Sequence, residues 1–147
     1  MPDEKYENNA IKEIITKHLI STKTFAEIDV DLFAPDGKWA SQIAKYLGNK
    51  MKVNQLRKVF GELKNIELTL KRQGKKDSDE FDEPRLSLLI PQLAYAKARK
   101  LIRKDFYELM KAVIGDKKTT KIKTAGDYRR FVEFMTAIVA YHKQYSN

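Results

Sequence analysis

The sequence predicts an all-α protein, a compact bundle of about five helices. Apolar side chains recur at three- and four-residue steps along most of the chain, which is the spacing of one helix face. Only 6 Gly and 4 Pro occur in 147 residues, which is sparse for an all-β protein with its frequent turns. A hydrophobic fraction of 42% is that of an ordinary globular chain, and this length suits one domain over residues 1–147.

The first third of the chain predicts two helices separated by an irregular segment. The first helix spans about residues 3–20, with Asp3 available as its N-cap. Residues 21–37 alternate only partly, so we expect an ordered loop packed on the core, with a short strand as the alternative. A short helix then covers 39–47, and Gly48 is placed to end it.

The middle of the chain predicts one helix and a charged loop. The helix starts near Lys52 and carries an apolar stripe to about residue 70, and Gly61 weakens its middle by roughly 1 kcal/mol relative to Ala. The segment near 73–83 is polar and contains five acidic residues, so we expect a flexible surface loop.

The last third predicts two further helices. One long helical pattern follows Pro84 and ends at Gly115, with Pro91 either in a first turn or at a kink. A basic loop covers 116–124. The final helix begins with a capping box from Thr124 to Asp127 and carries a broad apolar stripe as far as Tyr145.

The formal net charge of +9 is the unusual number of this composition. It is concentrated in residues 48–76, with 9 basic and 2 acidic side chains, and in residues 84–123, with 11 basic and 3 acidic side chains. Such an excess predicts an anionic partner, nucleic acid first and an anionic membrane surface second.

Other features exclude several classes. No apolar run approaches the roughly 18 to 20 residues that span a bilayer, and residues 1–5 lack the apolar core of a secretion signal. The absence of cysteine excludes disulfide scaffolds and thiol catalysis, so we expect a cytoplasmic protein. His18 and His142 lie on apolar stripes without metal-ligand spacing, and we interpret both as packing residues. We therefore predict no catalytic residue, no metal site and no cofactor.

Basic side chains form spaced rows on the predicted helices. One row holds Arg57, Lys58 and Lys64, and the other holds Lys97, Lys100, Arg103 and Lys104. Rows of this kind match the repeating phosphates of a nucleic-acid backbone and carry no base specificity. Polar Lys52, Asn54 and Gln55 add donors at a helix N-terminus, which favours phosphate.

Three segments together resemble one protein family. They are Val-Asn-Gln-Leu-Arg-Lys-Val-Phe at 53–60, Leu-Ile-Pro-Gln-Leu-Ala-Tyr-Ala-Lys-Ala-Arg at 89–99, and Phe-Val-Glu-Phe-Met-Thr-Ala-Ile-Val-Ala-Tyr-His-Lys at 131–143. In order and spacing they are similar to the small subunit of the type III-A CRISPR effector, the Csm complex. The resemblance covers about residue 40 to the C-terminus.

The resemblance implies a non-catalytic helical bundle whose copies stack along the complex, beside the guide RNA and its paired target RNA. The implied partners are both RNAs, the other Csm subunits and further copies of the chain. Carried over by position, it implies RNA contacts at Lys52, Gln55, Arg57, Lys58, Lys97 and Arg99, whereas Lys100, Arg103 and Lys104 come from the helical projection alone. On that projection Arg99 lies beside Tyr95, so pairing with a carboxylate is its alternative role.

Two other functions remain open at this point. The basic faces could dock acidic surfaces of partner subunits without touching RNA. A helical-bundle enzyme with an unrecognised site is the third hypothesis, for which loss of activity in a folded His142→Ala variant would be the sign.

Overall fold

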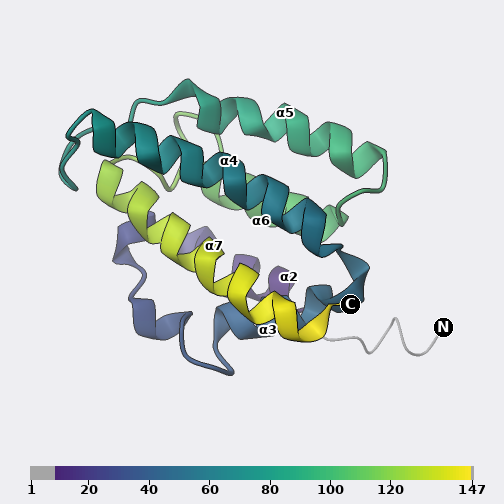
Figure 1. Ribbon diagram of the computed structural model, residues 1–147. Coiled ribbons are helices and arrows are strands. Elements are labelled where there is room, and N and C mark those ends of the chain that lie inside the picture. Colours follow the sequence, from purple (N-terminus) through teal and green to yellow (C-terminus); the bar gives the residue numbers. More distant parts are fainter. Residues whose placement is uncertain (1–8, 147) are drawn as a thin grey trace.

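The computed structural model describes residues 9–146, and this range contains six α-helices and no strand (Figure 1). The all-α prediction is confirmed, and the expected number of about five helices is one too low. The helices are α2 (Ala10–Lys17), α3 (Trp39–Leu47), α4 (Val53–Arg72), α5 (Pro84–Ala98), α6 (Lys104–Ile114) and α7 (Ala125–Tyr145). Short 3₁₀ turns are η1 (Leu19–Ser21), η2 (Phe25–Glu27), η3 (Val30–Leu32) and η4 (Gly48–Lys50).

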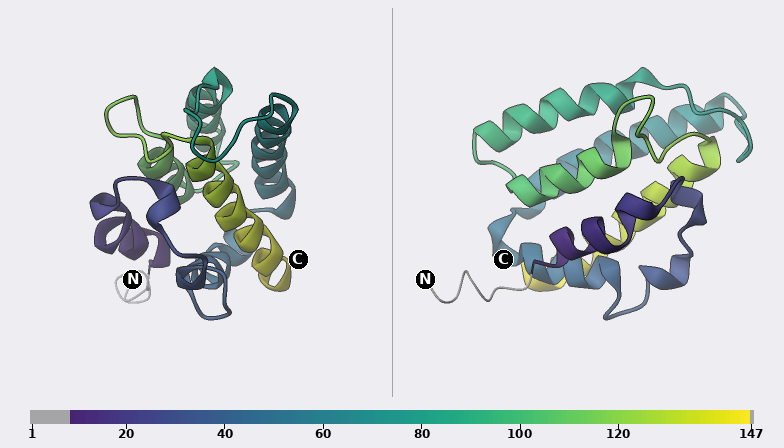
Figure 2. Two further views of the ribbon diagram at one scale, coloured as in Figure 1. Left: turned by 90° about the vertical axis from the view of Figure 1, so that its left-hand side faces the viewer. Right: turned by 180° about the vertical axis from the view of Figure 1, so that it is seen from behind.

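Helix α7 is the centre of the bundle. It packs against α3, α4 and the η2 turn, so segments from both ends of the chain lie side by side (Figures 1 and 2). The ring centroid of Phe134 lies 5.5 Å from that of Phe25 and 5.3 Å from that of Phe33. These rings are fully buried and tie the irregular segment 21–37 to the core.

The first described helix is shorter than the sequence predicts. Helix α2 ends at Lys17, and the N-cap is Asn9, whose side chain accepts a hydrogen bond from the Lys12 backbone N–H at 3.0 Å. The predicted cap Asp3 lies outside the described residues. His18 leaves the helix and is exposed, with its ring stacked 4.7 Å from that of Trp39, so its predicted burial is wrong although its packing role is confirmed.

Residues 21–37 form the ordered loop that the sequence predicts, without the alternative strand. The segment contains the 3₁₀ turns η2 and η3, and its side chains Phe25, Ile28 and Phe33 are buried. The Phe25 backbone N–H donates to the carbonyl of Lys121 at 2.8 Å, which joins this loop to the segment before α7.

The long helix predicted from Pro84 to Gly115 is wrong, because the chain turns back on itself between α5 and α6 (Figure 2). The N–H of Leu101 donates to the carbonyl of Ala96, and the N–H of Lys100 donates to that of Lys97. This is the Schellman pattern of a helix end, with Lys100 in the left-handed position at φ 60°. Lysine gives no sequence signal for that conformation, and Pro91 lies inside α5 without ending it.

Three other helix ends lie where the sequence predicts them. Gly48 ends α3 and Gly115 ends α6, both with positive φ. Thr124 and Asp127 form the predicted capping box of α7. The acidic segment before α5 is hydrogen-bonded to the start of α7, because Ala125 N–H donates to Asp79 O and Gly126 N–H donates to Asp77 O, both at 2.9 Å. The flexibility expected of this segment stays a prediction.

Within residues 9–146, no helix combines the length and the apolar character that crossing a bilayer would require.

Candidate nucleic-acid interface

The start of α4 and the turn between α5 and α6 meet at one end of the bundle (Figure 1). Most of the candidate RNA-binding residues belong to these two segments, and the turn after α5 breaks the row that the sequence predicts from Lys97 to Lys104. We call this region the corner surface. Its members are Lys52, Gln55, Arg57, Lys58, Lys97, Arg99, Lys100 and Lys104.

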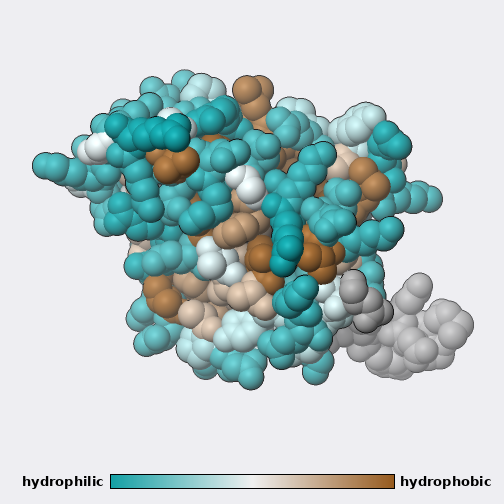
Figure 3. Space-filling view, viewed as in Figure 1, coloured by the Kyte–Doolittle hydropathy of each residue, from teal (hydrophilic) through white to brown (hydrophobic). Residues whose placement is uncertain are grey.

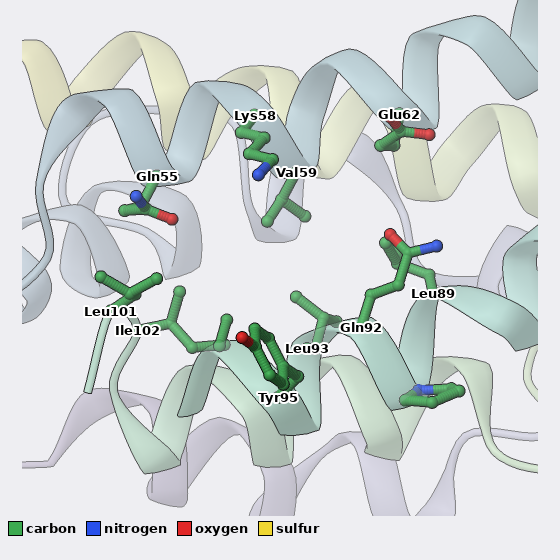
Figure 4. Close-up of a pocket in the computed structure, with 12 residues that line it drawn as sticks. Gln55, Lys58, Val59, Glu62, Leu89, Gln92, Leu93, Tyr95, Leu101 and Ile102 are labelled. Carbon is green, nitrogen blue, oxygen red and sulfur yellow. The ribbon is translucent and has the colours of Figure 1, made fainter. Parts of the chain in front are cut away.

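A groove of about 480 Å³ joins the two halves of the corner surface. Gln55 and Lys58 of α4 lie on one side, opposite Tyr95 of α5 and the Leu101–Ile102 turn (Figure 4). The floor is apolar, since Val59, Leu93 and Ile102 are buried there. Tyr95, at the edge of this floor, is 63% exposed.

The N-terminus of α4 opens on the same surface. Lys52 is the N-cap and makes no side-chain cap hydrogen bond, since an ammonium group cannot accept one. The first-turn N–H groups of a 20-residue helix therefore lack a side-chain acceptor from the cap residue. Partial positive charge at this helix end adds to the charges of Lys52 and Arg57, both of which are exposed.

At the turn between α5 and α6, two cations lie on aromatic rings. The ammonium of Lys97 is 4.3 Å from the centroid of Tyr107, and the guanidinium of Arg99 is 5.7 Å from that of Tyr95. Arg99 also donates to the Tyr95 hydroxyl at 3.1 Å. No carboxylate pairs with Arg99 among residues 9–146, and its contact with RNA stays a prediction.

Arg103 belongs to the packing of the bundle. Its Nε lies 3.0 Å from Oδ1 of Asp105, and it donates a second hydrogen bond of 3.0 Å to the hydroxyl of Tyr46 on α3. Tyr46 in turn donates to Asp105 at 2.5 Å. Burial opposes ionisation of Asp105, but hydrogen bonds from Arg103 and Tyr46 outweigh it and hold the pKa of Asp105 below its ordinary value.

Lys64 stands apart from the corner surface. Six residues separate it from Lys58, which is about 9 Å along a helix axis. Its ammonium forms an ion pair with Glu67 at 2.8 Å, so part of its charge is neutralised locally. Of the ten candidate residues, Lys64 and Arg103 are thus the two that have carboxylate partners within the described part of the chain.

The second histidine is a packing residue, as predicted. His142 is 1% exposed, and its Nε2 is hydrogen-bonded with the carbonyl of Gly48 at 2.9 Å. Its contacts join the end of α7 to the end of α3. Between residues 9 and 146, no three His, Asp or Glu side chains are grouped in a way that would hold a metal ion.

The face of the molecule seen in Figure 3 is not uniformly hydrophilic. Hydrophilic side chains cover much of α4 in the view of Figure 3, whereas a paler and more hydrophobic area lies below it, where α7 and α3 run. On α7, Ala137, Val139 and Tyr141 are only partly buried.

Comparison with known proteins places the chain in a family. The family model described as Csm2 Type III-A matches residues 37–147. Neither the curated proteins nor the solved structures gave a match. The matched range contains α3 to α7 and therefore the whole corner surface, and it leaves out α2 and the three 3₁₀ turns before α3. The chain belongs to the Csm2 family, and it is a small subunit of a type III-A CRISPR effector, the Csm complex.

Proposed function

We propose that this subunit is a non-catalytic scaffold of the cytoplasmic Csm complex, and that its corner surface binds the backbone of the guide RNA and its paired target RNA. The observation that carries the proposal is the grouping of cations from α4, α5 and α6 at one end of the bundle. Of these, Lys52, Arg57, Lys58, Lys100 and Lys104 are exposed and have no carboxylate partner among residues 9–146.

The chemistry of the corner surface suits phosphate better than base edges. Ammonium and guanidinium groups on the surface attract phosphates without distinguishing sequence, and each contact that forms releases counterions from the RNA. Gln55 and the N-terminus of α4 add uncharged donors beside these cations. The sequence of the RNA is then read by base pairing with the guide, outside this subunit.

Removing two of these cations tests the proposal. The Arg57→Ala/Lys58→Ala variant removes exposed side chains, so its helical circular dichroism stays that of the wild type. We expect weaker binding of single-stranded RNA, and a plot of log affinity against log salt whose slope falls by about 1.4, because each lost phosphate contact accounts for about 0.7.

The control is a variant with the same loss of charge elsewhere. Lys45→Ala/Lys71→Ala changes two exposed lysines, on α3 and in the last turn of α4, and neither lines the groove of the corner surface. Its affinity for RNA should stay within about twofold of the wild type. Equal affinities of the corner variant and the wild type at low salt would count against the proposed surface.

The second candidate function is a protein-interaction module whose basic faces dock acidic partner subunits. The apolar floor of the groove favours it, since exposed Tyr95 and Leu101 beside that floor suit a protein side chain. In that case the Arg57→Ala/Lys58→Ala variant loses binding to a neighbouring Csm subunit and keeps its affinity for RNA.

Self-association of the subunit is a further part of the proposal. The hydrophobic area over α7 and α3 in Figure 3 supports a contact between copies, because larger apolar areas on a surface mark interaction sites. Sedimentation over a wide range of protein concentrations tests it, and a strict monomer throughout would contradict it. Val139→Asp places a charge on this partly buried position and should shift the equilibrium toward monomer.

A further inference from the structure

A second basic region lies on the face seen from behind, where the loop before α7 approaches the η1 turn (Figure 2, right). A pocket of about 640 Å³ opens there, which is within the roughly 300–1,000 Å³ of small-ligand sites. We call it the lysine pocket. Its charged lining consists of Lys23, Lys111, Lys118, Lys121 and Lys123, and no acidic residue lines it. None of the corner-surface residues belongs to it.

Within residues 9–146, no carboxylate forms an ion pair with the five lysines of the lysine pocket. The nearby acids are used by the backbone instead: Asp116 accepts from Lys118 N–H at 2.8 Å and from Thr119 N–H at 3.0 Å, and Asp127 accepts from Lys123 N–H at 2.9 Å. Five like charges around one hollow repel each other, so a multivalent anion is favoured there.

The fold holds the two walls of the lysine pocket together. The carbonyl of Lys121 accepts from Phe25 N–H at 2.8 Å, and Lys121 N–H donates to the carbonyl of Val113 at 2.9 Å. Gly115 permits the tight turn between these bonds, since its φ is +51° and an added Cβ would collide with the Thr119 side chain. The lysines are therefore carried on backbone that is fixed from both sides.

The interior of the lysine pocket is partly apolar. Ile15, Leu19 and Ala112 line it, and Ile20 is 72% exposed at its edge. A simple inorganic anion gains no binding energy from an apolar surface. A nucleotide does, because its base packs on apolar side chains while its phosphate binds cations. A rim of ammonium groups around apolar side chains therefore matches a nucleotide unit better than phosphate alone.

We propose that the lysine pocket is a second RNA-binding site, which takes an unpaired nucleotide of a single strand. The base lies against Ile15, Ile20 and Ala112, and the flanking phosphates contact the five lysines. This inference does not rest on the corner surface, which is built from other residues, although α6 carries both Lys104 of the corner surface and Lys111 of the lysine pocket. With both sites, one subunit would hold two separate segments of RNA.

The test uses the full chain in the Arg57→Ala/Lys58→Ala background, so that the corner surface contributes little. The pocket variant adds Lys23→Gln, Lys118→Gln and Lys121→Gln, which keep long polar side chains at positions outside the core. A labelled short single-stranded oligoribonucleotide is the probe, read by fluorescence anisotropy at low salt. We expect roughly tenfold weaker binding and a salt slope smaller by about 2, the value for three lost phosphate contacts.

The matched control carries Lys12→Gln, Lys38→Gln and Lys45→Gln, three exposed lysines outside the lysine pocket. It has the same net charge as the pocket variant, and its affinity for RNA should stay within about twofold of that of the Arg57→Ala/Lys58→Ala variant. Circular dichroism of all variants checks that they fold. An equal loss of affinity in this control would overturn the proposal, because net charge alone would then explain the effect.

A second comparison separates a nucleotide from a bare anion. Ile20→Ser changes an exposed side chain, so folding is unaffected, and it should weaken the oligoribonucleotide about threefold while leaving an abasic phosphodiester of equal length unchanged. Equal effects on both probes would overturn the role of the base. Binding of an acidic peptide that depends on the same lysines, with no such dependence for RNA, would overturn the proposal as a whole.

The two proposals fail separately. If the corner variant binds RNA like the wild type and the pocket variant does not, the corner surface is refuted and the lysine pocket is supported. If the corner variant binds RNA more weakly than the wild type and the three pocket substitutions weaken it no further, the reverse holds.

Discussion

The guanidinium of Arg103 pairs with the carboxylate of Asp105 across the start of α6, with Nε and Oδ1 3.0 Å apart. Asp105 Oδ1 also accepts from the N–H of Phe106 at 3.1 Å, so this carboxylate satisfies one N–H in the first turn of α6 while it holds the arginine. A basic residue predicted to touch RNA is thereby directed toward α3, where the hydroxyl of Tyr46 completes the network.

The first prediction separates packing from binding at two adjacent residues. Arg103→Gln should lower the free energy of unfolding by about 1–3 kcal/mol, because Asp105 is left partly buried without its charged partner. Its neighbour Lys104 is exposed, so Lys104→Gln should leave stability within about 0.5 kcal/mol and weaken RNA binding instead. Urea unfolding and RNA titration of both variants measure this, and a stable Arg103→Gln variant with reduced RNA affinity would reverse the assignment.

The second prediction concerns the stability of the fold at acidic pH. The pKa of Asp105 in the folded chain lies below its ordinary value near 3.8, so the folded state favours the ionised form. Its contribution to stability is therefore complete above about pH 5 and is lost as the pH falls through 3.8 and below. Urea unfolding of the wild type and of Asp105→Asn should differ by a constant amount from pH 7 to 5, and the difference should shrink toward pH 3. A difference that is independent of pH would show that ionisation of Asp105 plays no part.

The third prediction addresses the left-handed residue between α5 and α6. Lys100 has φ 60°, a conformation that costs a residue with a Cβ about 1–2 kcal/mol and costs glycine much less. Lys100→Gly should therefore raise the free energy of unfolding by roughly 1 kcal/mol. Lys104→Gly, in the first turn of α6, serves as the comparison and should lower it. Destabilisation by both glycines would contradict the left-handed assignment of Lys100.

The fourth prediction uses two glycines of opposite character. Gly61 lies in the middle of α4, and an added Cβ meets nothing within 4 Å, so Gly61→Ala should stabilise the chain by about 0.5–1 kcal/mol. Gly115 has φ +51° and no room beside Thr119, so Gly115→Ala should destabilise it by more than about 1 kcal/mol. Thermal unfolding of both variants is the measurement, and shifts of the same sign would disprove this reasoning.

Much of the fold could be predicted because several helix ends carry their own chemical signals. Gly48 and Gly115 end helices where the chain adopts positive φ, and Thr124 with Asp127 starts α7. The break after α5 could not be predicted. It depends on Lys100 in the left-handed region and on Leu101 packing beside the groove, and neither residue type marks a helix end in a sequence.

The shape of the candidate site could not be predicted from the sequence, and its membership stays a prediction. Helical projection of one long helix aligned Lys97, Lys100 and Lys104 in a row, whereas the turn after α5 breaks this row and lies opposite the start of α4. The partner of Arg103 could not be foreseen either, since Tyr46 lies 57 residues away in sequence. The lysine pocket could not be predicted either, because its walls come from segments around residues 20 and 120 that are far apart in sequence.

The central position of α7 affects how the chain folds during its synthesis. Helices α3 and α4 and the η2 turn all precede α7 in the chain, and each buries apolar side chains against it. During synthesis on the ribosome these segments emerge before the helix that covers them. Until residues 125–145 have left the exit tunnel, the nascent chain exposes Phe25, Phe33 and the inner face of α4 to chaperones and to other nascent chains.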